Sequence, residues 1–187
     1  MRGARVWQYG NMHAVTRHPY ALAAALASIA AGFLHGTLIA AAHAGIPPAF
    51  LFFLLSGFLQ VAWGAQFLHR RTLGWFYAGA VLNAGLTFFW LLSRTLPAPL
   101  ADAPEPIAPL GILVAMIQLI AVATSFWCLY RAHTVTYARL ALVILCSLAL
   151  AAIGYAAAKG GEEALRALWP EMEEGAHHDS ADEGHGE

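Results

Sequence analysis

The most constraining feature of the sequence is a long stretch without charged side chains. Between Arg17 and Arg70 there is no Lys, Arg, Asp or Glu. A bilayer core about 30 Å thick requires about 20 apolar residues per helix, so this stretch is long enough for two crossings. Its only turn signal is the segment 43–48, which contains a glycine and two prolines. The sequence therefore predicts membrane-spanning helices at about residues 20–42 and 49–68.

Charged residues also mark the ends of three later apolar stretches. These predict helices at about residues 73–92, 110–130 and 140–158. A loop at 95–109 holds five of the nine prolines and separates the third helix from the fourth. Such a loop belongs in water, because proline-rich backbone lacks the internal hydrogen bonds that lipid demands.

Composition supports the same fold class. Hydrophobic residues make up 59% of the 187 residues and charged residues only 11%, whereas soluble domains carry about 25% charged residues. So few charges suit a surface in contact with lipid. We therefore expect an all-α, polytopic membrane protein, with an N-terminal segment at 1–19, a five-helix bundle at 20–158 and an acidic tail at 159–187.

Basic residues predict the orientation. With the N-terminus inside, seven basic residues lie on the cytoplasmic side and three lie outside, and the reverse orientation inverts this ratio. Cytoplasmic loops carry the excess of Lys and Arg, so we expect an N-in, C-out topology with a periplasmic or extracellular tail. The inner set is Arg2, Arg5, Arg17, Arg70, Arg71, Arg131 and Arg139, and the outer set is Arg94, Lys159 and Arg166.

Residue size predicts how the helices pack. The first and fifth helices are rich in small residues, which allow close backbone approach, so both are expected to pack tightly against protein. The Phe-rich second helix is expected to face lipid or a partner. Gly160-Gly161 is expected to precede a separate interfacial helix at 162–169. Cys128 and Cys146 are expected to be buried thiols.

Three histidines in the acidic tail are candidate metal ligands. His177, His178 and His185 lie among carboxylates, and imidazole suits copper and zinc. No H-x-x-x-H or C-x-x-C spacing preforms a coordination geometry there. The alternative interpretation is a solvated acidic tail with incidental histidines.

Further candidates lie toward the predicted outer face. His35 and His43 are eight residues apart, which in an α-helix gives about 12 Å of rise and about 80° of rotation, so they are not a chelating pair by themselves. Either can join a composite metal site, or else His43 caps the turn and His35 bonds to a neighbouring helix. Arg94 can snorkel to the headgroups or pair with Glu105 or Asp102 and shape the outer loop.

Several functional classes are disfavoured. None of the five spans has an Asp or Glu, which a proton or ion pathway would need. The last three spans have no histidine, so no bis-histidine haem is expected. The motifs H-E-x-x-H, G-x-S-x-G and Walker A are absent, so neither enzymatic activity nor a nucleic-acid partner is expected. The polar residues of the spans are expected to hydrogen-bond between helices: Gln60, Gln66, Asn83, Thr87, Gln118 and Thr124.

Two short segments carry a family resemblance. Residues 90–95 read W-L-L-S-R-T and residues 104–107 read P-E-P-I. They resemble the W-x-x-S-R-T and P-E-P-V segments of an uncharacterised, actinobacterial-type family of multi-pass proteins. The second helix at 52–63 and the pair His35 and His43 are also similar. The resemblance implies a bacterial cytoplasmic (inner) membrane and is uninformative on activity.

The chain departs from that family in the fourth helix. The similar proteins usually carry an Asp and a Glu seven residues apart, and by position these correspond to Gly111 and Gln118. This chain therefore has no acid at either of those two positions.

These observations leave three functional hypotheses. The leading one is a non-enzymatic membrane protein that binds or handles copper or zinc on the outer face, through the tail histidines with or without His35 and His43. The second is an accessory or structural subunit of a larger membrane complex. The third is a small-solute or ion transporter, which would have to form a homo-oligomer because five helices are few for an alternating-access carrier.

Overall fold

The computed structural model describes residues 19–44, 47–69, 72–97 and 104–168. The described part of the chain is helical, without strands. Its elements are α2 (Pro19–Leu34), the π-helical η1 (His35–Ile39), α3 (Ala40–Ala42), α4 (Pro47–His69), α5 (Leu73–Thr95), α6 (Pro109–Arg131) and α7 (Tyr137–Leu168). The N-terminal segment 1–18 and the tail histidines His177, His178 and His185 lie outside the described residues.

Five of the described helices are long and apolar enough to cross a membrane. The predicted number of spans is confirmed, and their ends differ from the predicted ones by a few residues. This architecture fits a multi-pass membrane protein. The candidate spans are Pro19–Ala42, Ala49–His69, Leu73–Thr95, Pro109–Arg131 and Tyr137–Gly160.

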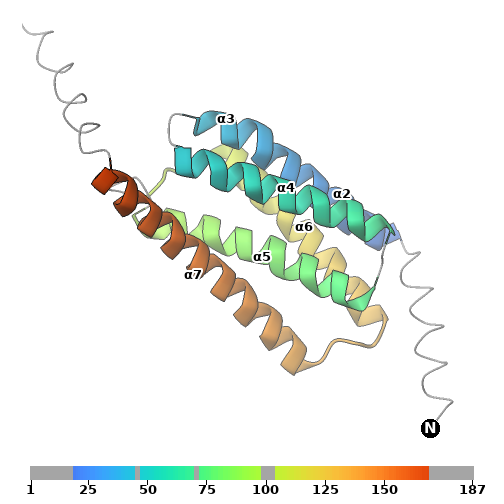
Figure 1. Cartoon of the computed structure of the whole chain (residues 1–187). Helices are drawn as coiled ribbons and strands as arrows, with labels where there is room; N and C mark the ends of the chain where they lie inside the picture. Colours follow the sequence, from blue (N-terminus) through green and yellow to red (C-terminus); the bar gives the residue numbers. More distant parts are fainter. Residues whose placement is uncertain (1–18, 45–46, 70–71, 98–103, 169–187) are drawn as a thin grey trace, which may run out of the picture.

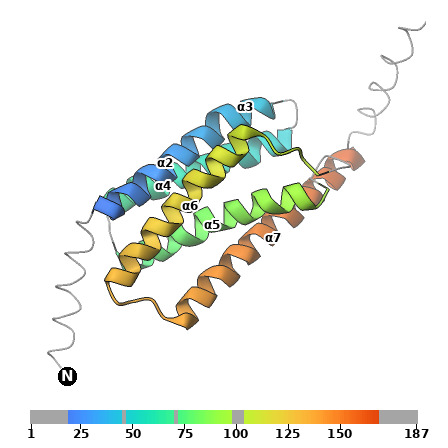
Figure 2. The same ribbon diagram turned by 180° about the vertical axis from the view of Figure 1, so that it is seen from behind.

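The bundle is built from α2, α4, α5 and α6, with α7 at one edge (Figures 1 and 2). α2 packs against α4 and α6, while α5 packs against α6 and α7. The expected tight packing is confirmed for α2, where Ala21, Ala24 and Ala25 are fully buried. It is wrong for the fifth helix, because only 17% of its span is buried.

The small residues of α7 are spread around the helix rather than gathered in one stripe. Val143, Ser147 and Ala151 recur every four residues and form the buried face. Leu145 and Ile153 are exposed on the outside. The expected break at Gly160-Gly161 is also wrong, since α7 continues to Leu168. Glycine lowers helix stability by only about 1 kcal/mol and does not by itself end a helix.

The expected exposure of the Phe-rich α4 and the expected burial of both cysteines hold only in part. Phe58 is 66% exposed, but Phe67 is fully buried and stacks on Trp63. Cys128 is buried, whereas Cys146 is exposed on α7. In both cases the rotation of the helix decides burial, and residue type alone does not reveal that rotation.

Glycine allows α2 and α4 to touch through their backbones. A Cβ atom at Gly57 would lie 2.5 Å from the carbonyl oxygen of Gly32 and 2.6 Å from the nitrogen of Gly36. Only glycine fits at such a contact. Because η1 begins one residue before Gly36, this contact holds His35 close to α4.

Candidate functional site

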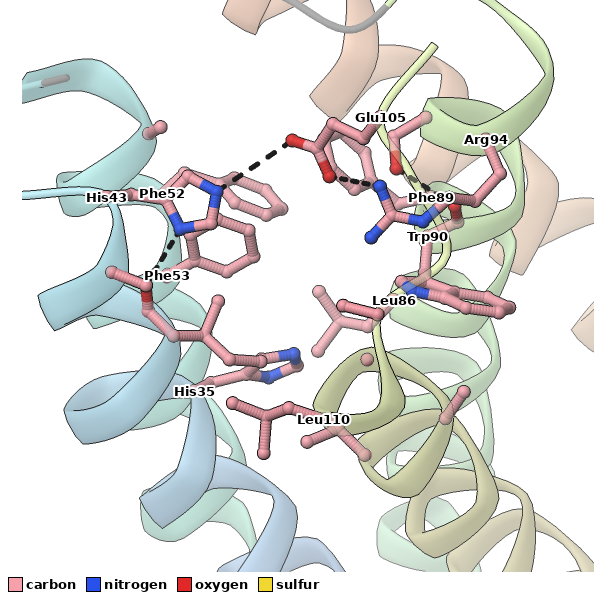
Figure 3. A pocket seen from close by; sticks show the side chains of 18 of the residues that line it. His35, His43, Phe52, Phe53, Leu86, Phe89, Trp90, Arg94, Glu105 and Leu110 are labelled. Carbon is pink, nitrogen blue, oxygen red and sulfur yellow. Dashed lines mark hydrogen bonds and ion pairs between the residues drawn. The ribbon is translucent and has the colours of Figure 1, made fainter.

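A cavity of about 180 Å³ lies between η1, α3, α4, α5 and α6, at the end of the bundle that carries His43 (Figure 3). An engineered apolar cavity of about 150 Å³ accepts benzene, so this one has room for a ring-sized molecule. Its walls are mainly apolar and aromatic, and include Phe52, Phe53, Leu86, Phe89, Trp90, Leu110 and Val114.

Charged side chains lie across the mouth of this cavity. The backbone N–H of Glu105 donates to the carbonyl of Ser93 at 3.0 Å, which folds the loop back onto the end of α5. This brings the Glu105 carboxylate into an ion pair with the Arg94 guanidinium. The pairing of Arg94 with Glu105 is thus present, while Asp102 lies outside the described residues.

His43 approaches the same carboxylate from the other side. Its Nε2 lies 3.8 Å from Oε1 of Glu105, a contact that is an ion pair only when the imidazole is protonated. Its Nδ1 lies 2.8 Å from the carbonyl oxygen of Ile39 and therefore donates to it, so His43 does cap the last turn. Two ligand atoms do not complete a metal site. No group of three or more His, Cys, Asp or Glu side chains that could hold a metal ion occurs in the described ranges.

His35 lies deeper, 8% exposed, at the start of the π-helix. Its Nδ1 is 2.8 Å from Oε1 of Gln60 on α4, the bond to a neighbouring helix that was one of its two expected roles. Gln60 Nε2 donates to Asn83 Oδ1 at 2.9 Å, and Asn83 Nδ2 donates to the Gly79 carbonyl at 2.9 Å and to Ser28 Oγ at 3.2 Å. A hydrogen-bonded chain therefore joins the cavity to the centre of the bundle.

The π-helix explains why both histidines line one cavity. In a regular α-helix His43 would be rotated by about 80° from His35, at about 100° per residue. A π turn contains one extra residue, which reduces the rotation between His35 and His43 by about 100°. The two side chains then differ by roughly −20° around the helix axis. The expected rotation of about 80° assumed a regular α-helix, because no local signal in the sequence marks the η1 turn. Such turns occur frequently at functional sites.

Three nitrogen atoms of cavity-lining residues are buried without a hydrogen-bond partner in the described part of the chain. They are Trp90 Nε1, Arg94 Nε and Gln118 Nε2. Gln118 is 1% exposed, and its Oε1 accepts a hydrogen bond from Thr87 Oγ1 at 3.2 Å. A fourth unpaired atom, Ser125 Oγ, belongs to a residue that does not line the cavity. Because buried polar groups are almost always paired, the three N–H groups of cavity-lining residues are candidate donors to a bound molecule.

Four of the predicted site residues thus meet at one cavity: His35, His43, Arg94 and Glu105. Gly111 and Gln118 line it too. Sequence reasoning missed the aromatic wall of the cavity, including Trp90. No pattern linked Phe52 and Phe53 to it, because their rotation toward the cavity depends on helix packing.

No family model, curated protein or solved structure matches this chain. The cavity and the groups around it are therefore the basis for assigning a function.

Proposed function

We propose that this protein binds a small, mainly apolar molecule within its helix bundle, without chemically converting it. The observation that carries this proposal is the aromatic cavity with unpaired N–H groups in its wall. Each unpaired buried N–H costs roughly 1–3 kcal/mol. A bound molecule with an acceptor atom relieves this cost and fills the cavity.

The predicted orientation supports an extracytoplasmic entrance. With the N-terminus inside, the loop that carries Glu105 and the turn at His43 both lie on the outer side. The ligand then enters past the Arg94–Glu105 pair from outside or from the outer leaflet. The cavity belongs to the membrane-embedded part of the chain, which suits a ligand that partitions into lipid.

Transition-metal handling remains a second proposal. It is favoured by the approach of His43 Nε2 to Glu105 Oε1 at the mouth, which supplies two suitable ligand atoms. The predicted tail ligands would have to complete the site. Neither the subunit hypothesis nor the transporter hypothesis has a comparable supporting observation among the described residues.

A cavity-filling substitution tests the binding proposal. Ala115 on α6 is 7% exposed and lines the cavity, so Ala115→Phe places a ring inside it. Ala123→Phe on the exposed face of the same helix is the matched control. The probe is p-xylene at a concentration about ten times its Kd. We expect it to raise the free energy of unfolding of wild type and of Ala123→Phe by about 1.4 kcal/mol. The free energy of unfolding of Ala115→Phe should not change. The measurement is the Tm of full-length protein in lipid nanodiscs.

Two outcomes would count against binding in this cavity. One is an equal rise of Tm in wild type and Ala115→Phe, because the probe would then act elsewhere. The other is no rise of Tm in wild type.

A further inference from the structure

The hydrogen-bonded chain behind the cavity determines which nitrogen of His35 carries its proton. The carbonyl of Gly79 can only accept, so Asn83 must present its NH₂ group there and its oxygen to Gln60. Gln60 must then donate to Asn83 and present its own oxygen to His35. The Nδ1 of His35 therefore carries the hydrogen, and in the neutral ring Nε2 has a free lone pair.

The environment of His35 favours the neutral ring. The described contacts of the imidazole are the amide of Gln60 and the ring of Phe53, whose centroid lies 5.8 Å away. A buried charge without a counter-ion is costly, and these contacts provide none. His35 thus lines the cavity as a hydrogen-bond acceptor, with no partner for Nε2 in the described part of the chain.

The opposite wall carries a donor. Figure 3 shows Trp90 and His35 on opposite sides of the cavity. The indole N–H can only donate, and it is among the buried atoms without a partner. Gly111 makes room for it, since a Cβ atom at that position would lie 2.7 Å from Trp90 Nε1. The amide of Gln118 can turn to present either its oxygen or its NH₂ group, so it does not decide the ligand class.

The charge balance of the wall favours a neutral ligand. Arg94 is already paired with Glu105, so the guanidinium is not an unmatched cation awaiting a carboxylate or phosphate. The rings of Phe52, Phe53 and Phe89 provide flat apolar surfaces, which suit an aromatic ligand.

We propose that the cavity recognises a hydroxylated aromatic ring, held between an acceptor and a donor; this assignment rests on the proposed function. A ring O–H donates to Nε2 of His35, and a second oxygen on the ring accepts from the Nε1–H of Trp90. A dihydroxybenzene meets both requirements. The same chemistry is found in a free phenol and in the quinol ring of a membrane lipid.

Two isosteric probes separate recognition of the hydroxyl groups from simple filling of the cavity. Hydroquinone, kept under argon, and p-xylene have the same shape, but only hydroquinone can form the two hydrogen bonds. We expect His35→Phe and Trp90→Phe each to weaken hydroquinone binding about tenfold, the value of one net hydrogen bond, and to leave p-xylene within twofold. His69→Phe and Trp127→Phe, exposed and away from the cavity, are the matched controls and should change neither affinity.

The apparent Kd of each probe comes from the dependence of Tm on probe concentration in nanodiscs. Comparison of hydroquinone with its 2-decyl derivative distinguishes the two sources. Weaker binding of hydroquinone or of its 2-decyl derivative in His35→Phe, with p-xylene binding unchanged, supports the proposal. Whichever of the two hydroquinones binds wild type more tightly identifies the source.

A spectroscopic signature tests the role of His35 independently of the variants. The ¹⁵N spectrum of full-length protein should show His35 as the tautomer protonated at Nδ1, with hydroquinone shifting the Nε2 resonance. Observation of the Nε2-protonated tautomer would overturn the assignment. So would an equal loss of both probes in the variants, because the side chains would then only maintain the cavity. If p-xylene itself fails to bind wild type, the proposed function fails, which is a separate result.

Discussion

At the scale of single residues, three of the four buried, unpaired polar side-chain atoms in the described residues belong to residues that line the cavity, and the fourth is Ser125 Oγ. Gln60 and Asn83 are fully buried, yet their amide groups are paired through the chain that reaches His35. Trp90 and Arg94 keep unpaired nitrogens at the cavity wall. An unpaired buried group costs about 1–3 kcal/mol, and an acceptor bound at these positions would remove that cost.

The metal proposal is tested at this scale. Copper or zinc is expected to bind full-length protein, and truncation after Gly175, which removes the three tail histidines, should lower the stoichiometry. His43→Ala should weaken binding about tenfold, by loss of one ligand near Glu105. His69→Ala, exposed at the other end of α4, is the control. Isothermal titration measures both quantities. An unchanged stoichiometry after truncation would remove the tail from this hypothesis.

The sequence predicted that polar side chains would form hydrogen bonds, but it did not predict their partners in every case. The expectation that polar span residues bond between helices is met by Gln60 with Asn83 and by Thr87 with Gln118. Thr124 instead bonds to carbonyls of its own helix. Which partner a residue finds depends on the rotation of its helix in the bundle, and no local pattern specifies that.

At the scale of elements, we expect the π-helix η1 to tolerate the deletion of one residue. Deletion of Leu38, which is 54% exposed, would convert the π turn into an α turn and restore regular spacing between His35 and His43. We expect the free energy of unfolding to change by less than about 1 kcal/mol.

The matched deletion is Leu119, 47% exposed in the regular helix α6. Its removal rotates one part of α6 by about 100° against the other, and should cost more than about 3 kcal/mol. Denaturant unfolding in mild detergent measures both. Equal losses for the two deletions would contradict the role assigned to η1.

The helices themselves were predicted well, because the cost of burying charge in lipid keeps charged residues out of the spans. The packing of α7 was not predicted correctly. Its Ala and Gly content suggested a protein-facing helix, but only the face with Val143, Ser147 and Ala151 meets α5. Inside a membrane, lipid and protein are similarly apolar, so composition distinguishes the two environments poorly.

At the scale of the whole molecule, the orientation is a prediction that labelling can test. In a background with Cys128→Ser and Cys146→Ser, Ile107→Cys lies in the loop before α6 and Thr136→Cys in the loop before α7, both at exposed positions. With the N-terminus inside, a membrane-impermeant maleimide should label Ile107→Cys in intact cells, and Thr136→Cys only after permeabilisation. The opposite pattern would place the mouth of the cavity in the cytoplasm.

The glycine contact between α2 and α4 has a consequence for biogenesis. Of the five candidate spans in the described residues, these two are made before the other three, and the contact of Gly57 with Gly32 and Gly36 needs no later part of the chain. A helical hairpin can therefore form during insertion and already carry the bond between His35 and Gln60. Trp90, Arg94 and Glu105 are synthesised later. The cavity is therefore completed only when α5 and α6 pack against the hairpin of α2 and α4.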